Sequence, residues 1–326
     1  MDETQPLLVM RVPDCLMSSR LVPILLLGTL MIGACRSART SLSPESASEL
    51  RDRVDSLEAL NDSLARAASL RNPNLHSTLW AQTSVEYTGT ARQAYALAEV
   101  RMRQALADST WTAALEQAEN GSGVYRDKPP AVVLDVDETV LDNSAYQARL
   151  IRNNAAYSSE TWKAWVREER AGAVPGALGF TQAAVRSGVQ VIYLTNRDAD
   201  VEESTRDNLK ALGFPIDDAP DAVLTQGEME GWGPKSARRA WVAERYRILL
   251  LIGDNFGDFV AQADTTVAAR RKRSHALRRY WGTRWIVLPN AQYGSWEGAL
   301  YHFNYDLPTL QTLEEKHDHL NPQRPN

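Results

Sequence analysis

Short apolar runs recur from the middle of the chain onward, and polar residues follow each of them directly. The runs span residues 131–135, 189–194, 248–252 and 285–288, the first ending in an aspartate. Apolar runs of about 4–8 residues bounded by turn-forming residues are typical of buried strands. Segments with the apolar spacing of helices separate them, at 181–187, 201–212 and 236–245. This alternation predicts an α/β fold whose parallel sheet is covered by helices on both faces.

The segment before the first strand is helical in pattern. Residues 80–106 predict a helix at the start of the folded domain, and Pro129 and Pro130 end the helical region. We therefore expect a Rossmann-like parallel sheet with a small, mainly helical cap, formed by residues 74–326. The cap elements are expected at about 80–128 and 144–187.

The N-terminus carries an apolar run, residues 21–34, with Arg20 before it and Cys35 directly after it. The run is shorter than the roughly 20 apolar residues of a transmembrane helix and is typical of a signal peptide. Its last residues, Ile-Gly-Ala-Cys, resemble a bacterial lipobox. They predict a lipoprotein signal peptide over residues 1–34, lipidation of Cys35, and an exported protein anchored to the cell envelope, at the periplasmic or surface face of the outer membrane. An uncleaved signal anchor is the alternative.

Between the anchor and the folded domain, residues 35–73 have apolar positions with a heptad-like spacing. Those positions are Leu50, Val54, Leu57, Leu64 and Ala68, with Asn61 at one core position. The pattern fits a short coiled-coil stalk. Because fewer than the roughly 3–4 heptads of a sustained coiled coil are present, residues 35–73 are predicted to be a solvated tether with a fraying helix, and the coiled coil is the alternative.

Paired carboxylates at the end of the first strand are the strongest chemical signal. Asp135 and Asp137 stand one residue apart in Asp-Val-Asp-Glu-Thr. Such a pair suits a division of labour in which one carboxylate attacks covalently and the other transfers protons. Three polar residues, Thr195, Lys235 and Asp254, follow in order along the chain. In a parallel sheet the residues that follow the strands converge at the carboxyl edge, which is where ligands bind.

At these motifs the chain resembles the haloacid dehalogenase superfamily of phosphohydrolases, and specifically the class C acid phosphatases, the family of the lipoprotein e(P4) 5′-nucleotidases. The resemblance covers roughly residues 80–305. It rests on DVDETVLDNSAY at 135–146, LTNR at 194–197, the lysine of GPKSARR, GDNFGDF at 253–259 and LPNAQYGSWEGAL at 288–300. Gly257 departs from the family pattern, since relatives often carry a polar or acidic residue there.

The resemblance implies a role for each of these residues. Asp135 would be the nucleophile and Asp137 the general acid and base, while Thr195, Asn196 and Lys235 would bind the phosphoryl group. Mg²⁺ would be held by the carboxylates of Asp135 and Asp254 and by the backbone carbonyl of Asp137, with Asp258 orienting a ligated water. This agrees with the physics of phosphoryl transfer, in which negative charge spreads over oxygens that need fixed cations and donors.

Substrate choice is predicted from two aromatic residues. In the family, aromatic residues at the positions of Trp162 and Tyr293 sandwich a nucleobase, which implies nucleoside 5′-monophosphates as substrates. Stacking suits an enzyme that accepts several bases, because every base has a π-face. The alternative is that Trp162, Trp165 and Tyr146 pack the cap helices.

Composition changes this interpretation little. The net charge of −5 gives no general reason to expect polymeric nucleic acid as a partner, although the segment 270–284 is locally basic. That segment is interpreted either as a solvated helix face or as a site that attracts anionic substrates or lipid headgroups. The predicted partners are a small phosphomonoester and a membrane, and the sequence leaves a homo-oligomer open. A phosphotransferase with the same site and a non-catalytic ligand-binding lipoprotein are the alternative functions.

Overall fold

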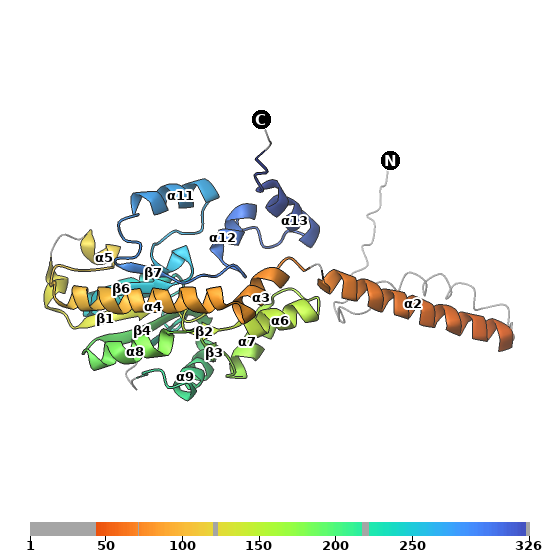
Figure 1. Ribbon diagram of the computed structural model, residues 1–326, viewed down its shortest axis with the longest axis horizontal. Coiled ribbons are helices and arrows are strands. Elements are labelled where there is room, and N and C mark those ends of the chain that lie inside the picture. The colour runs from red at the N-terminus through yellow and green to blue at the C-terminus, as the bar shows by residue number, and fades with distance from the viewer. Residues whose placement is uncertain (1–43, 71, 120–122, 217–221, 324–326) are drawn as a thin grey trace, which may run out of the picture. The chain divides into compact units, whose positions relative to one another are not determined.

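The computed structural model describes residues 44–70, 72–119, 123–216 and 222–323 of the chain (Figure 1). The chain divides into two compact units, residues 1–64 and 65–326. The predicted signal peptide and Cys35 lie outside the described residues. Among the residues that are described, no helix is both long and apolar enough to cross a membrane.

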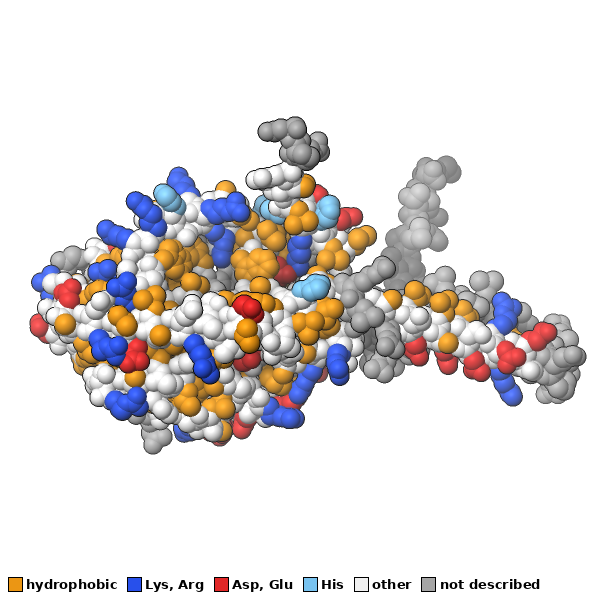
Figure 2. Space-filling model, in the orientation of Figure 1, with side chains coloured by type: hydrophobic (Ala, Val, Ile, Leu, Met, Phe, Trp, Pro, Cys, Tyr) orange, Lys and Arg blue, Asp and Glu red, His pale blue; other side chains and the backbone are white. Residues whose placement is uncertain are grey.

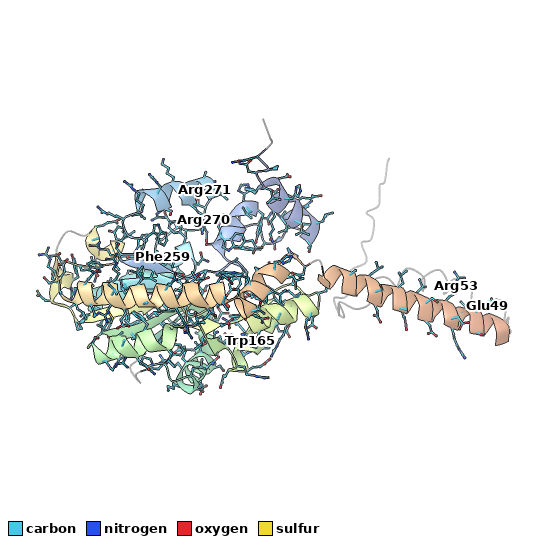
Figure 3. The ribbon with its side chains drawn as sticks, in the orientation of Figure 1. Glu49, Arg53, Trp165, Phe259, Arg270 and Arg271 are labelled. Carbon is cyan, nitrogen blue, oxygen red and sulfur yellow. The ribbon has the colours of Figure 1, made fainter. Side chains whose placement is uncertain are left out.

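The helix α2 (Pro44–Leu70) makes up all of the described part of the first unit, and its last residues belong to the second. Its apolar residues Leu50, Val54, Leu57 and Leu64 are all exposed, and Figure 2 shows a row of hydrophobic side chains along this helix. Figure 3 labels Glu49 and Arg53 on the same helix. The helix therefore has an amphipathic surface of its own.

A five-stranded parallel sheet forms the centre of the second unit, in the order β5-β4-β1-β6-β7. Its strands are β1 (Pro130–Leu134), β4 (Gln190–Asp198), β5 (Val223–Gln226), β6 (Arg247–Gly253) and β7 (Trp285–Val287). The predicted α/β fold class is confirmed. The strand β5 was not predicted, because only its apolar residues Val223 and Leu224 mark it in the sequence.

Alternate residues of the strands point into two separate hydrophobic cores, as the period-two geometry of a strand requires. In β1, Val132 and Leu134 belong to one core, which α4 (Val85–Leu106) covers together with α8 (Ala177–Arg186) and α9 (Glu202–Ala211). Ala131 and Val133 belong to the other, which α10 (Lys235–Arg245) covers. Burial on both faces explains why the strands are continuous apolar runs.

Two differences from the sequence prediction concern the helices before β1. The stretch 80–106 is not one helix, because α3 (Leu75–Thr83) ends and α4 begins on either side of Ser84, whose side chain accepts a hydrogen bond from the Tyr87 amide. Moreover, the segment 80–128 was expected to contribute to the cap, but α4 packs against α8, β6 and β7. This part of the segment therefore covers the sheet.

The segment that follows β1 forms a small substructure above the sheet edge. The strands β2 (Leu141–Asp142) and β3 (Gly172–Ala173) pair as a two-stranded antiparallel sheet. The helices α6 (Ser144–Arg152) and α7 (Ser159–Arg167) lie between these strands in the sequence. The remaining elements are α5 (Leu115–Ala118), α11 (Val267–Ala276), α12 (Ser295–Gly298), α13 (Thr309–Asp318) and the short 3₁₀ helices at 124–127, 199–201, 256–258 and 299–301.

Candidate active site

The register of the sheet brings three strand ends together. Leu134 of β1 pairs with Tyr193 of β4 and with Ile252 of β6, so the next residues of each strand lie side by side. The amide of Asp135 continues this pairing by donating to the carbonyl of Ile252, at 2.9 Å. The polar residues at the carboxyl ends of β1, β4 and β6 therefore share one edge of the sheet, as the sequence predicted.

Lys235, the first residue of α10, also reaches this edge of the sheet. Its Nζ donates to Oδ1 of Asp135 and, at 2.7 Å, to Oδ1 of Asp258. Burial opposes the charge of this lysine, but the attraction of Asp135 and Asp258 outweighs it, so that its pKa is raised. Lys235 is therefore a permanently charged cation between two carboxylates.

Three carboxylates form a compact cluster at the same place. One oxygen from each of Asp135, Asp254 and Asp258 lies within 4.8 Å of the other two. Burial, and then the charge of Asp258, raises the pKa of Asp254 to about 6, and burial also raises the pKa of Asp135. A Cβ at Gly253 would collide with the side chain of Asp258, so glycine is needed for this close approach.

These residues fit a hard divalent cation, because they offer carboxylate oxygens and an excess of negative charge that Lys235 alone does not balance. One oxygen of Asp258 lies within the same 4.8 Å of the other two carboxylates, although the resemblance implied that Asp258 would act through a water. Its Oδ2 accepts a hydrogen bond from the amide of Asn255, at 2.8 Å, which fixes its position. Asn290 in turn donates to Oδ2 of Asp254, at 2.8 Å.

Asp137 is held by a different set of groups. Its Oδ1 accepts hydrogen bonds from Nε and Nη2 of Arg197, at 3.0 and 2.8 Å, and from Nδ2 of Asn143, at 2.9 Å. Its Oδ2 lies 3.4 Å from Oγ1 of Thr195. Asp137 is thus only two residues from Asp135 in sequence, but it pairs with a different cation, Arg197.

The two predicted phosphate-binding residues, Thr195 and Asn196, lie in β4 at this edge. Thr195 is fully buried, and its Oγ1 accepts from the amide of Arg197, at 3.1 Å. Asn196 is exposed, and its carbonyl Oδ1 accepts from Arg238, at 2.8 Å. Because Arg238 occupies the carbonyl side of this amide, the NH₂ side is the one that can donate to a phosphoryl oxygen.

The two predicted base-binding residues lie next to the motif that begins at Asp135. The Tyr293 hydroxyl donates to Oε2 of Glu138, a buried carboxyl whose pKa is raised by burial and then by the charge of Asp137. Trp162 in α7 packs edge-on against Tyr146, with ring centroids 5.1 Å apart, and the guanidinium of Arg197 lies 5.5 Å from its ring centroid. Both aromatic residues are partly exposed.

Three buried residues support the predicted site residues, and two of them, the arginines, were not assigned a role from the sequence. Arg197, Arg238 and Asn143 are at most 2% exposed, and each contacts a predicted site residue. Arg197 directly follows Thr195-Asn196, so its position just after the strand predicted at 189–194 was a signal that could have identified it. Arg238 lies one helical turn after Lys235 and had no such signal.

The basic side chains of the segment 270–284 are either partly buried or exposed. Arg270 donates to the carbonyl of Ala263, at 2.7 Å, and to Oγ of Ser295, at 2.9 Å, whereas its neighbour Arg271 is exposed (Figure 3). Arg284 donates to the carbonyl of Thr112, at 2.9 Å. Part of the cluster therefore serves to pack the loops around β7.

Comparisons with known proteins show which family and which solved structures the chain is similar to. The family described as HAD superfamily, subfamily IIIB (acid phosphatase) matches residues 59–296. A class C acid phosphatase from Bacillus anthracis is 31% identical, with a TM-score of 0.68, and the match covers 78% of this chain and 100% of that one. The same phosphatase crystallised with tungstate bound gives 31% identity, a TM-score of 0.69 and the same coverage. Acid phosphatase 1 of Solanum lycopersicum is 29% identical over 135 residues, which are 40% of this chain and 52% of the tomato protein. The chain thus spans about half the length of this curated relative.

Proposed function

The chain belongs to the class C acid phosphatases of HAD subfamily IIIB, and from that premise we propose that it hydrolyses phosphate monoesters through a phospho-aspartate on Asp135. The observation that carries the proposal is the convergence of Asp135, Lys235 and Asp254 at one strand edge, with Asp137 two residues from the nucleophile. A binding protein would have no use for a second carboxylate placed for proton transfer.

In the proposed reaction, a carboxylate oxygen of Asp135 attacks phosphorus while the ester P–O bond breaks. Asp137 gives its proton to the leaving alkoxide, and the alcohol departs. Asp137 then takes a proton from a water molecule that attacks the phosphorus of the acyl phosphate, which releases inorganic phosphate and restores Asp135. Throughout both steps Lys235, Thr195 and the NH₂ of Asn196 bind the phosphoryl oxygens, where negative charge accumulates.

We include Mg²⁺ in the proposal because the carboxylates present fit it. Asp135, Asp254 and Asp258 would hold the ion, together with the backbone carbonyl of Asp137 that the resemblance implies. When bound, Mg²⁺ neutralises the repulsion between the Asp135 carboxylate and a phosphate dianion. The raised pKa values of Asp135 and Asp254 support a cation here, since they reflect buried negative charge that lacks full compensation.

Nucleoside 5′-monophosphates are the substrates we propose. Trp162 and Tyr293 come from α7 and from the loop before α12, and each contacts a residue next to the catalytic carboxylates. A base held between them would therefore lie close to Asp137. We also propose that lipidated Cys35 anchors the enzyme to the cell envelope, as the lipobox-like sequence predicts.

Phosphate release tests the activity. The purified protein should release inorganic phosphate from mononucleotides and from p-nitrophenyl phosphate in the presence of Mg²⁺, and EDTA should abolish the release. Asp135→Asn keeps the size of the side chain but removes the nucleophile, so we expect kcat to fall at least about a hundredfold. Wild-type protein without activity on any phosphomonoester would contradict the proposal, and transfer of phosphate to an added alcohol would identify a phosphotransferase.

A further inference from the structure

Arg197 is a buried cation that the proposed reaction does not yet use. It lies near the end of β4, is 2% exposed, and its guanidinium faces Asp137 rather than the carboxylate cluster. Its Nε and Nη2 both donate to Oδ1 of Asp137, and its Nη1 donates to Oγ1 of Thr205 in α9, at 3.1 Å. The guanidinium is therefore held at both ends.

The two oxygens of Asp137 have unequal surroundings. Oδ1 accepts three hydrogen bonds, two from Arg197 and one from Asn143, all between 2.8 and 3.0 Å. The contact of Oδ2 is with Thr195, at the longer distance of 3.4 Å. Because Oδ1 is saturated with donors that cannot accept a proton, Oδ2 is the oxygen that can carry one.

A second layer of contacts fixes the donors themselves. Asn143 accepts hydrogen bonds at its Oδ1 from Nε1 of Trp165, at 2.9 Å, and from Nη2 of Arg197, at 3.4 Å. Trp165 is a buried residue of α7, labelled in Figure 3. The position of the Asp137 carboxylate is thus determined jointly by β4, α9 and α7.

We propose that Arg197 is a positioning residue, which saturates Oδ1 of Asp137 and so presents Oδ2 for both proton transfers. This rests on the proposed function. Oδ2 gives its proton to the leaving oxygen as the ester bond breaks, and takes a proton from the attacking water as the acyl phosphate is hydrolysed. Without the guanidinium the carboxylate can rotate, and either oxygen can face the substrate.

The leaving group distinguishes this role from a purely structural one. An alkoxide is strongly basic and must be protonated as it departs, whereas p-nitrophenolate leaves with little assistance. General acid catalysis typically contributes about 10²–10⁴-fold where it is needed. A misplaced acid therefore lowers the rate for alkyl phosphates far more than for p-nitrophenyl phosphate.

The experiment compares kcat/KM across phosphomonoesters that range from alkyl phosphates to p-nitrophenyl phosphate, because kcat/KM reports the step in which the leaving group departs. For Arg197→Ala we expect a loss on alkyl phosphates at least about tenfold greater than the loss on p-nitrophenyl phosphate. Arg197→Lys is a milder variant that keeps the charge and one donor, and it should restore part of the alkyl activity. Asp137→Asn gives the reference for complete loss of the acid.

Arg247 supplies the matched control. It is also buried, at 6% exposed, but donates to the backbone carbonyls of Ala105 and Asp108, and it has no hydrogen bond to a site residue within the part of the chain that the structure describes. Arg247→Ala should lower the melting temperature and leave the ratio of alkyl to p-nitrophenyl activity unchanged. An equal loss on every leaving group in both Arg197 variants would overturn the positioning role while phosphatase activity stands, whereas an inactive wild type would overturn the proposed function itself.

Discussion

Asp254 shows how the buried carboxylates of the site make stability depend on pH. Burial and the charge of Asp258 raise its pKa to about 6, from an ordinary value of 3.8. Ionising a group whose pKa is raised by folding costs stability, so its contribution is fully present below about pH 4 and is lost as the pH rises through about 6. We expect the melting temperature of the metal-free protein to fall over this range.

The proposed Mg²⁺ should reverse this loss, because it would bind the ionised carboxylates and would therefore stabilise the protein most at the higher pH. Thermal melts at several pH values, in EDTA and in Mg²⁺, measure both effects. In Asp254→Asn the fall with pH should be shallower and the stabilisation by Mg²⁺ much smaller. Identical curves for the wild type and this variant would exclude Asp254 from the metal site.

Trp162 and Tyr293 carry the prediction of nucleotide specificity. If they stack on a base, each contact contributes about 1–3 kcal/mol that a small aryl phosphate does not gain. Replacing either by alanine should lower kcat/KM for nucleoside 5′-monophosphates by roughly 5- to 150-fold and change that for p-nitrophenyl phosphate little. Purine and pyrimidine nucleotides should both be affected.

A partly buried tryptophan elsewhere provides the comparison. Trp241 in α10 packs against Trp232 and Arg245. Trp241→Ala should lower the melting temperature without changing the preference between the two substrate classes. Parallel loss on both classes in the Trp162 and Tyr293 variants, with a similar loss of stability, would mean that these aromatic residues pack the fold and do not bind a base.

At the residue scale, the sequence identifies polar residues that directly follow apolar runs. It does not identify charged residues on helices that are buried in the folded protein. Asp135, Thr195 and Asp254 were identified because each follows an apolar run. Arg238 was not, because a charged residue on a helix is usually exposed, and only the structure shows it to be fully buried beneath Asn196.

At the scale of elements, the strands predicted at 131–135, 189–194, 248–252 and 285–288 are confirmed, since burial on both faces makes such runs conspicuous. The strand β4 extends further, to Asp198, although its last residues are polar. Tertiary contacts extend the strand over these polar residues, because Asp198 pairs with Gln226 of β5. The local sequence does not indicate this pairing.

The helix α2 presents a separate prediction, because its pattern fits either a coiled coil or a solvated tether. Leu57 is 61% exposed and lies on the heptad positions with Leu50, Val54 and Leu64. In a parallel coiled coil the Leu57 side chains of two chains would face each other. Under mild oxidation Leu57→Cys should then form a disulfide-linked dimer, measured by non-reducing electrophoresis.

Asp52→Cys is the matched control, since residue 52 lies outside the heptad core of the same exposed helix. It should cross-link much less than Leu57→Cys. Equal and slow cross-linking of the two variants would contradict the coiled coil and favour the solvated tether.

At the scale of the whole molecule, the predicted lipid anchor, Cys35, belongs to the first unit of the chain, whereas the candidate catalytic residues belong to the second. Cys35→Ser removes the predicted acceptor, so metabolic labelling with palmitate should disappear and the enzyme should no longer fractionate with membranes. Because attachment through two or more acyl chains is effectively stable, the difference in membrane association between the wild type and Cys35→Ser should be large. Cys15→Ser is the control and should keep the label, whereas equal label on the wild type and the Cys35→Ser variant would contradict the lipobox interpretation.

The central claim, a phosphoryl group carried by Asp135, is tested most directly by trapping the intermediate. Enzyme mixed with a phosphomonoester and Mg²⁺ is quenched in acid during turnover and treated with borohydride, which reduces an acyl phosphate to the alcohol. Peptide mass spectrometry should then find homoserine at position 135 in the wild type, and only when substrate was present. Turnover that leaves position 135 as unmodified aspartate, or that places the reduced residue elsewhere, would contradict the account.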